Sequence, residues 1–300
     1  CHNGQLFFRA TSSLGSELWK SDGTAGGTTL VKDLYTGSGR SSLPKCFTSV
    51  GPTLFFVAAS SGRGPELWKT DGTSSGTVRV QTSGAIGTFP TDLVRCGDRL
   101  LFTANSVFGR EVWVSNGSAS GTRMLRDIFP GGVGSSPSQL TCCDGIVYFS
   151  ATNGSAGLEL WRTDGTTAGT RMALDIRRGS EGSAPASLTC CDGILFFSAT
   201  GTGTGRELWK SDPTSGLTVL VRNIEPGAAA SHPTNFECAG TGVYFRASGP
   251  SGGSRAGAEL WFSDGTASGT KPWIQGAPTH QVGPQGCASR IAQSTVMPLA

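Results

Sequence analysis

The sequence predicts an all-β protein: a six-bladed β-propeller with four short antiparallel strands in each blade. The first observation is an internal repeat, because the segment ELWKSDGT at 17–24 recurs in related form at intervals of 45 to 52 residues. A repeat of this length is typical of propeller blades and solenoid units. The second is composition: 45 glycines and only 15% charged residues suit a β protein with many tight turns. The six copies begin at Glu17, Glu66, Glu111, Glu159, Glu207 and Glu259.

Each repeat divides into four β-like runs, which in the fifth copy cover 186–191, 194–199, 207–211 and 218–222. The second run, ILFFSA at 194–199, is apolar on both faces of a strand, which indicates a sheet covered on both sides. The sequence shows no 3.6-residue apolar period, so we expect very little helix. A β-solenoid is the alternative fold, but its units are usually shorter and its ends need dedicated caps.

The chain is predicted to form a single domain. It starts at Cys1 without Met or a signal peptide, so we expect it to be part of a longer protein. The first repeat lacks its first strand, and we expect the C-terminal segment to supply that strand and close the ring. The repeats cover approximately 1–45, 46–90, 91–138, 139–186, 187–233 and 234–280, followed by the closing segment 281–300.

The repeated motif is best explained by structure. Asp-Gly-Thr favours a hairpin corner between the third and fourth strands, since Gly accepts positive φ and Asp bonds the backbone two residues on. The repeated Glu is expected to accept hydrogen bonds between blades. The tryptophans are expected to pack blade against blade, with sugar stacking as the alternative. They are Trp19, Trp68, Trp113, Trp161, Trp209 and Trp261.

Nine cysteines suggest disulfides and a secreted, oxidised setting. Six of them are assigned to one column, between the first and second strands of each repeat: Cys1, Cys46, Cys96, Cys143, Cys191 and Cys238. Because equivalent positions of neighbouring blades lie close together, we expect the pairs Cys96–Cys142, Cys143–Cys190 and Cys191–Cys238. Cys1 would pair with Cys46 or with Cys287, and one thiol is left over.

No metal, cofactor or catalytic residue is predicted. The chain has three histidines and no Cys-x-x-Cys pair, and the polar column after the fourth strand is too varied for a ring of metal ligands. A bound calcium ion is the alternative considered for that column. Its members are Asp33, Thr82, Asp127, Asp175, Asn223 and Gln275.

Two segments match the acceptor pattern for N-glycosylation, at Asn116 and Asn153, both at predicted turns. The net charge of +3 is spread along the chain, so we expect no nucleic-acid partner. No apolar run is long enough for a membrane span, so no membrane insertion is expected.

The motif Glu-Leu-Trp-x-x-Asp-Gly-Thr-x-x-Gly-Thr resembles the repeat of the ELWxxDGT repeat family over about residues 1–275. The third repeat departs with Val112 and Asn116, and the fifth with Pro213. These departures touch turns, so we expect any effect to be on local geometry and not on the fold. The resemblance implies a propeller-like module of an extracellular or cell-surface protein. It brings no catalytic residues.

From these observations we expect a non-enzymatic extracellular module, a building block of a surface appendage, filament or matrix glycoprotein. Its partners would be other domains of the same protein or neighbouring copies, with glycans as a further candidate. The alternative is a lectin-like propeller, which exposed tryptophans would favour. An enzyme is disfavoured, because the carboxylates fall into repeated columns and the few histidines form no set with them.

Overall fold

The computed structural model describes residues 1–37, 39–81, 88–250 and 257–273, and every regular element in these ranges is a β-strand. None of the described residues forms a helix that could cross a membrane. The strands form six antiparallel sheets, one for each sequence repeat, which we number blades 1 to 6. The all-β, propeller-type fold predicted from the repeat is therefore confirmed.

Blades 2 to 6 each contain four strands, and blade 1 contains three. Blade 1 consists of β1 (Leu6–Ser12), β2 (Gly15–Ser21) and β3 (Thr29–Lys32). Blade 2 consists of β4 (Lys45–Val50), β5 (Thr53–Ser60), β6 (Arg63–Thr70) and β7 (Val78–Arg79), and blade 3 of β8 (Thr88–Cys96), β9 (Arg99–Ser106), β10 (Gly109–Ser115) and β11 (Arg123–Met124).

Blade 4 consists of β12 (Ser138–Cys143), β13 (Ile146–Thr152), β14 (Leu158–Thr163) and β15 (Arg171–Leu174). Blade 5 consists of β16 (Ala186–Cys191), β17 (Ile194–Thr200), β18 (Arg206–Ser211) and β19 (Thr218–Arg222), and blade 6 of β20 (Thr234–Ala239), β21 (Gly242–Ser248), β22 (Ala258–Ser263) and β23 (Lys271–Pro272).

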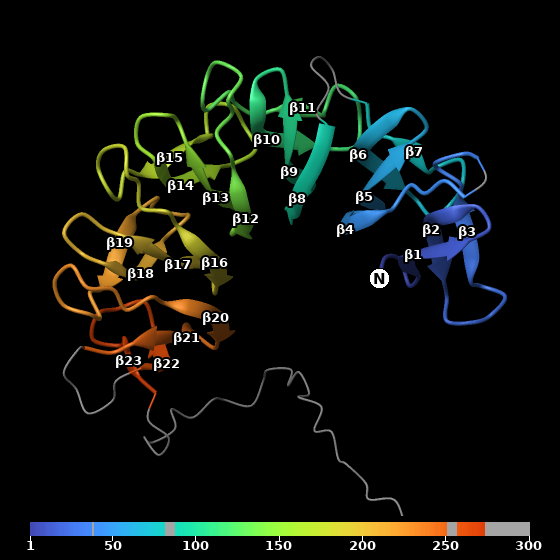
Figure 1. The fold of residues 1–300 in the computed structure, drawn as a ribbon. Coiled ribbons are helices and arrows are strands. Elements are labelled where there is room, and N and C mark those ends of the chain that lie inside the picture. The colour runs from blue at the N-terminus through green and yellow to red at the C-terminus, as the bar shows by residue number, and fades with distance from the viewer. Residues whose placement is uncertain (38, 82–87, 251–256, 274–300) are drawn as a thin grey trace, which may run out of the picture.

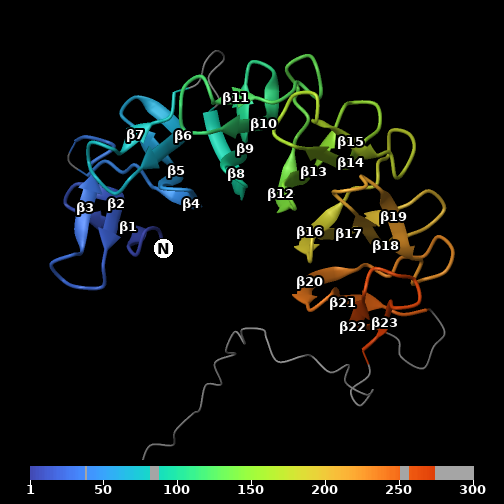
Figure 2. The same cartoon turned by 180° about the vertical axis from the view of Figure 1, so that it is seen from behind.

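The blades stand side by side along an arc, with the first strands of blades 2 to 6 at its inner edge (Figures 1 and 2). Among the described residues the arc is open, because blades 1 and 6 lie apart in both views. The expected closing segment 281–300 lies outside the described residues. Ring closure is thus not seen in the part of the chain that the structure describes, and the inner strand of blade 1 is missing there.

The corner between the third and fourth strands is a closed hydrogen-bond network, as blade 4 shows. Asp164 Oδ1 accepts from the backbone N–H of Thr166 at 2.9 Å and from its hydroxyl at 2.6 Å. Thr166 Oγ1 in turn accepts from the N–H of Gly169 at 2.9 Å. The Thr170 hydroxyl lies 2.7 Å from the Thr163 hydroxyl and 2.6 Å from the Thr166 carbonyl oxygen. The polar residues of the motif thus find their bonding partners inside the turn, so the Asp serves the turn.

Blade 5 shows why the motif needs its later glycine. A Cβ added to Gly169 would fall 2.1 Å from the Asp164 carboxylate, so a side chain at this place displaces the aspartate. In blade 5 the place is taken by Leu217, and Asp212 there bonds the Ser215 hydroxyl at 2.8 Å instead. The different turn geometry expected from Pro213 is therefore accompanied by a second departure, at Leu217.

The buried apolar clusters of the described residues lie at the junctions between blades. Five hydrophobic clusters fill the five junctions, and each draws side chains from two neighbouring sheets. At the junction of blades 3 and 4, for example, Val112 and Leu125 of blade 3 meet Phe149 and Trp161 of blade 4. The motif tryptophans of blades 2 to 6 are 3–8% exposed, whereas Trp19 of blade 1 is partly exposed at the free end of the arc.

Basic side chains tie several corners to the preceding blade. Lys32 Nζ donates to the Thr77 carbonyl oxygen at 2.8 Å, and Arg126 Nη1 donates to the Thr170 carbonyl oxygen at 2.9 Å. Arg222 makes the corresponding bond to Thr270. A cation on a carbonyl oxygen is a charge-assisted bond, so these contacts fix the register of one blade on the next.

The position of the tryptophans predicts unequal costs for truncation. Trp161→Ala should lower the free energy of unfolding by about 3–5 kcal/mol, because it leaves a cavity at a junction. Trp19→Ala, the matched change at the free end of the arc, should cost clearly less. Urea denaturation followed by circular dichroism measures both, and equal losses would contradict the packing described here.

Candidate functional site

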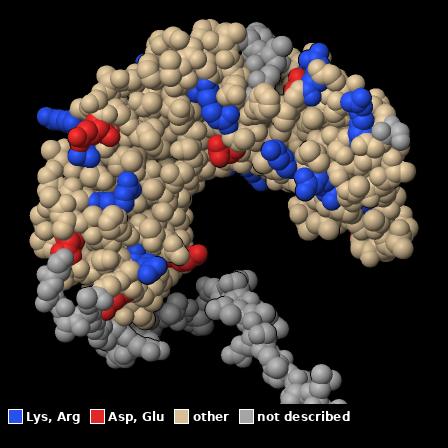
Figure 3. Space-filling model, viewed as in Figure 1, with Lys and Arg blue, Asp and Glu red and all other residues tan. Residues whose placement is uncertain are grey.

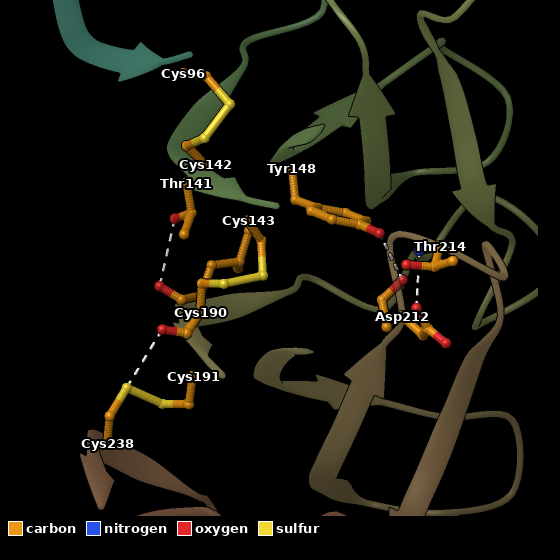
Figure 4. The surroundings of a disulfide bond; sticks show 12 residues. Cys96, Thr141, Cys142, Cys143, Tyr148, Cys190, Cys191, Asp212, Thr214 and Cys238 are labelled. Carbon is orange, nitrogen blue, oxygen red and sulfur yellow. Dashed lines mark hydrogen bonds between the residues drawn. A yellow bond between two sulfur atoms is a disulfide. The ribbon is translucent and has the colours of Figure 1, made fainter. Parts of the chain in front are cut away.

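A chain of three disulfides runs along the inner edge of blades 3 to 6 (Figure 4). Each joins the last residue of one inner strand to the penultimate residue of the next. The vicinal cysteines let one blade bond both neighbours. The bonds are Cys96–Cys142, Cys143–Cys190 and Cys191–Cys238, with Cα–Cα distances of 5.4, 5.3 and 5.3 Å. These are the pairs given by the repeat register, and they indicate an oxidising, extracellular setting.

The six cysteines expected in one column occupy three different places: Cys96, Cys143 and Cys191 end their inner strands, whereas Cys1, Cys46 and Cys238 do not. Cys46 is the second residue of β4, at a bulge where its φ is 58°, and it corresponds to Gln139 of blade 4. Cys1 corresponds to the penultimate position held by Cys142, as does Cys238. Cys1 and Cys46 are exposed free thiols, so the proposed Cys1–Cys46 bond is not formed. Cys287 lies outside the described residues.

A serine–histidine pair replaces the disulfide at the junction of blades 1 and 2. His2 Nδ1 lies 3.0 Å from Ser49 Oγ, and His2 Nε2 lies 3.1 Å from the Pro52 carbonyl oxygen. A carbonyl oxygen only accepts, so the second bond assigns the proton to Nε2 and leaves Nδ1 to accept from the Ser49 hydroxyl. Asn3 Nδ2 lies 3.2 Å from Nε2. Because a protonated Nε2 donates, the Asn3 amide is to be turned so that its oxygen faces Nε2 and accepts.

The pair has the first geometric feature of an activated nucleophile, a hydroxyl on a histidine nitrogen. Three features indicate instead that the pair links two blades. His2 is only 5% exposed, and its second partner is a neutral carbonyl that stabilises an imidazolium less than a carboxylate would. His2 and Ser49 also hold the last and penultimate positions that cysteines hold at later junctions. Sequence reasoning missed the pair because no local motif joins residues 2 and 49.

A small pocket of about 210 Å³ opens beside the Cys96–Cys142 bond, between blades 3 and 4. The turns after β8 and β12 and the corner of blade 4 line it. Its charged residues are Asp98, Asp164 and Arg99, and Arg99 lies 3.6 Å from Asp98. Its volume is below the roughly 300–1,000 Å³ of sites for drug-sized ligands. It suits a ligand of few atoms. Its lining residues are Cys96, Gly97, Asp98, Arg99, Leu101, Gly145, Val147, Thr163, Asp164 and Gly165.

The motif glutamates of blades 1 to 5 are buried. Glu66 accepts from Arg79 Nη1 at 2.8 Å. The other four bond the loop to the next blade, as Glu159 shows: it accepts from the N–H groups of Ile176 and Arg177 at 3.1 Å, and from Ser183 N–H at 2.9 Å and its hydroxyl at 2.5 Å. The donors lie in the loop that leads from blade 4 to blade 5. The carboxylate therefore holds a connection, which refines the expectation of bonds between blades.

Burial raises the pKa of Glu159 above the ordinary range, and the bonds from Ser183, Arg177 and Ile176 offset only part of this effect. The pKa of Glu111 and of Glu207 is raised for the same reason. The corner aspartates behave oppositely: the hydroxyl of Thr166 lowers the pKa of Asp164. One motif thus holds two carboxyl groups with opposite shifts, because one is desolvated and the other sits in a turn at the surface.

The remaining candidates are placed as follows. Asn116 is exposed at the corner of blade 3, and Asn153 lies in the loop after β13; the side-chain oxygen of each closes its own turn. Asp33, Asp127, Asp175 and Asn223 follow the last strands of their blades, whereas Thr82 and Gln275 lie outside the described residues. No group of three or more metal-ligating side chains occurs among the described residues. Figure 3 shows basic side chains scattered singly over a largely uncharged face.

Comparison with known proteins gives matches in structure alone. No protein-family model and no curated protein matches the sequence. A puromycin-hydrolyzing peptidase of Mycobacterium tuberculosis matches 90% of this chain and 45% of its own, at 14% identity and TM-score 0.50. A prolyl endopeptidase matches 90% and 41%, at 12% identity and TM-score 0.55. An oligogalacturonate lyase in complex with manganese matches 87% and 71%, at 13% identity and TM-score 0.47.

The two peptidase matches correct the expected function. A non-enzymatic module was expected because the carboxylates fall into repeated columns and the few histidines form no set with them, yet both peptidases contain this fold. The lectin-like alternative required exposed tryptophans, and five of the six motif tryptophans are buried. At 11–14% identity the likeness shows the fold alone, and the chain spans less than half the length of the two peptidases.

The opposite pKa shifts predict opposite pH dependences. Folded Glu159 binds protons more readily than an unfolded glutamate of pKa 4.5, so its contribution to stability falls as the pH rises through its folded pKa. The unfolding free energy of the wild type minus that of Glu159→Gln should therefore increase as the pH is lowered from 7 to about 4.5. For Asp164→Asn the difference should shrink as the pH falls below 3.8. Chemical denaturation across this range measures both, and parallel curves would refute the assignment.

The disulfide between Cys143 and Cys190 should stabilise the fold more than the hydrogen bond between His2 and Ser49 does. Replacing Cys143 and Cys190 together by Ser should lower the free energy of unfolding by about 2–4 kcal/mol, because a 47-residue loop is no longer closed. Ser49→Ala should cost about 1 kcal/mol, the usual contribution of one hydrogen bond. Thermal unfolding of the oxidised proteins gives the comparison. A Ser49→Ala loss as large as that of the double variant would contradict it.

Proposed function

We propose that this chain is the propeller domain of an extracellular hydrolase of the peptidase class, and that it controls which substrates reach a catalytic part elsewhere in the same protein. The observation that supports this best is the match to a prolyl endopeptidase at TM-score 0.55, in which the matched region is 41% of the enzyme. In that endopeptidase, dynamics between domains have a role in catalysis and specificity. A propeller that accompanies a second domain is thus a suitable model for this chain.

The use of carboxyl groups in the chain supports a catalytic part elsewhere. Four of the buried motif glutamates are committed to loop connections, as Glu159 is, and Glu66 is paired with Arg79. The corner aspartates are committed to their turns, as Asp164 is. Of the histidines, His2 is committed to the junction of blades 1 and 2. The described residues therefore supply a rigid frame, and its inner edge is fixed by three disulfides.

Secretion and surface display complete the proposal. Disulfides persist outside the reducing cytosol. The exposed corner of Asn116 and the loop of Asn153 are accessible to glycosylation if the protein passes through a secretory pathway that attaches glycans. The resemblance of the motif to the ELWxxDGT repeat family agrees with this location.

The test uses the natural full-length protein that contains this sequence, incubated with aminoacyl amides, prolyl peptides and puromycin. We expect hydrolysis by the full-length protein and none by residues 1–300 alone. In the full-length protein, replacing Cys143 and Cys190 by Ser should raise KM for peptides of ten or more residues and leave kcat for a single aminoacyl amide unchanged. Failure of the folded full-length protein to hydrolyse any of these substrates would overturn the proposal.

A further inference from the structure

The two terminal blades expose the surfaces that every inner junction buries. On the side that faces the following blade, the residue before the motif tryptophan is 0–4% exposed in blades 1 to 5. In blade 6 the equivalent Leu260 is 48% exposed. Trp273, which follows β23, is 43% exposed, whereas its equivalents Val80 and Leu125 are 6% and 1% exposed. The outer side of blade 6 is thus an apolar sheet face without the neighbour that blades 1 to 5 have among the described residues.

Blade 1 exposes the complementary side, the one that faces a preceding blade. Leu6 is 50% exposed, whereas its equivalents in blades 2 to 6 are 0–3% exposed. Phe8 and Trp19 are partly exposed, although the corresponding Phe–Trp pairs are buried in every later blade. In the inner junctions these positions contact the residues equivalent to Leu260 and Trp273, as Phe149 and Trp161 contact Val112 and Leu125.

We propose that the outer face of blade 6 in one copy of this chain packs against blade 1 of a second copy, and so extends the series of blade junctions between molecules. The interface would continue one that already occurs five times within the chain. Surfaces that repeat a buried interface are complementary in shape and register by construction. The proposal does not depend on the proposed enzymatic role.

A second copy fits the geometry better than closure within one chain. The terminal blades of the described arc lie apart, so the two faces do not meet in one molecule (Figures 1 and 2). The contact is heterologous, since it joins two different faces. Apolar side chains of this size exposed together at a sheet face mark an interaction surface.

The cysteine register gives the contact a specific chemical test. At the three junctions of blades 3 to 6, the last residue of one inner strand is bonded to the penultimate residue of the next. In blade 1, Cys1 occupies the place that corresponds to the penultimate residue of the inner strand, as Cys142 does in blade 4. The last position of blade 6 holds Ala239, so the new junction has one of the two sulfurs that the bond needs.

The experiment supplies the missing sulfur. In the 300-residue chain carrying Cys46→Ser and Cys287→Ser, the change Ala239→Cys should give a disulfide between Cys1 of one copy and the cysteine introduced at position 239 of another. Mild oxidation should then produce covalent dimers and larger species on non-reducing gels, and peptide mapping of mixed isotope-labelled and unlabelled protein should show the bond to be intermolecular. Two controls should not crosslink: the same variant with Cys1→Ser, and Glu237→Cys in place of Ala239→Cys.

A bond within one chain would show that the ring closes on itself and would overturn the proposal, as would the absence of any bond in folded protein. Analytical ultracentrifugation gives an independent measure of self-association. It uses the chain with its natural cysteines, with the free thiols Cys1 and Cys46 kept reduced. Leu260→Glu should weaken self-association about tenfold or more, since it places a charge in the apolar contact. Leu217→Glu, at a similarly exposed leucine on the corner of blade 5, should leave it unchanged. Equal effects of the two changes, or a monomer at all concentrations, would contradict the proposal.

Discussion

The packing of one sheet on the next is the interaction on which the rest of the structure depends. No blade has an apolar core of its own among the described residues, since each of the five clusters takes its side chains from two blades. Stability in such an array is approximately the sum of terms for single blades and for junctions between nearest neighbours. The disulfides, the His2–Ser49 pair and the cations on corner carbonyls all act at these junctions. The polar devices therefore reinforce contacts that apolar burial creates.

The carboxyl groups of the motif show how one repeated sequence serves two electrostatic purposes. The glutamate is desolvated and needs several donors, so it can hold a long loop in a fixed place. The aspartate stays at the surface and organises only its own turn. Both roles repeat around the arc, which leaves an asymmetric function to the places where the repeats differ. The described differences are concentrated at the inner edge, with a histidine at one junction and cysteines at three.

The sequence predicted much of the architecture because the constraints involved are local or repeated. The period placed blades 2 to 6, whose first strands begin at positions 45, 88, 138, 186 and 234, within three residues of the expected boundaries. The Asp-Gly-Thr corner and the buried tryptophans followed from short-range chemistry. Cys46 was misplaced because alignment by residue type ignores the bulge in the inner strands. The His2–Ser49 contact spans 47 residues and has no local motif that would reveal it. The structural likeness to a prolyl endopeptidase could not be found from the sequence, because the identity is only 12%.

The disulfide chain also determines how the molecule would respond to a pulling force. Force that enters at Cys96 passes through Cys142 to its covalent neighbour Cys143, then through Cys190 and Cys191 to Cys238. The loops between these cysteines carry no tension, although they contain most of blades 3, 4 and 5. Released, each loop of 46 or 47 residues would add roughly 150 Å of contour length. The segment from Cys96 to Cys238 is thus nearly inextensible under load, and extension is confined to the chain before Cys96 and to the chain beyond Cys238, which holds the last three strands of blade 6.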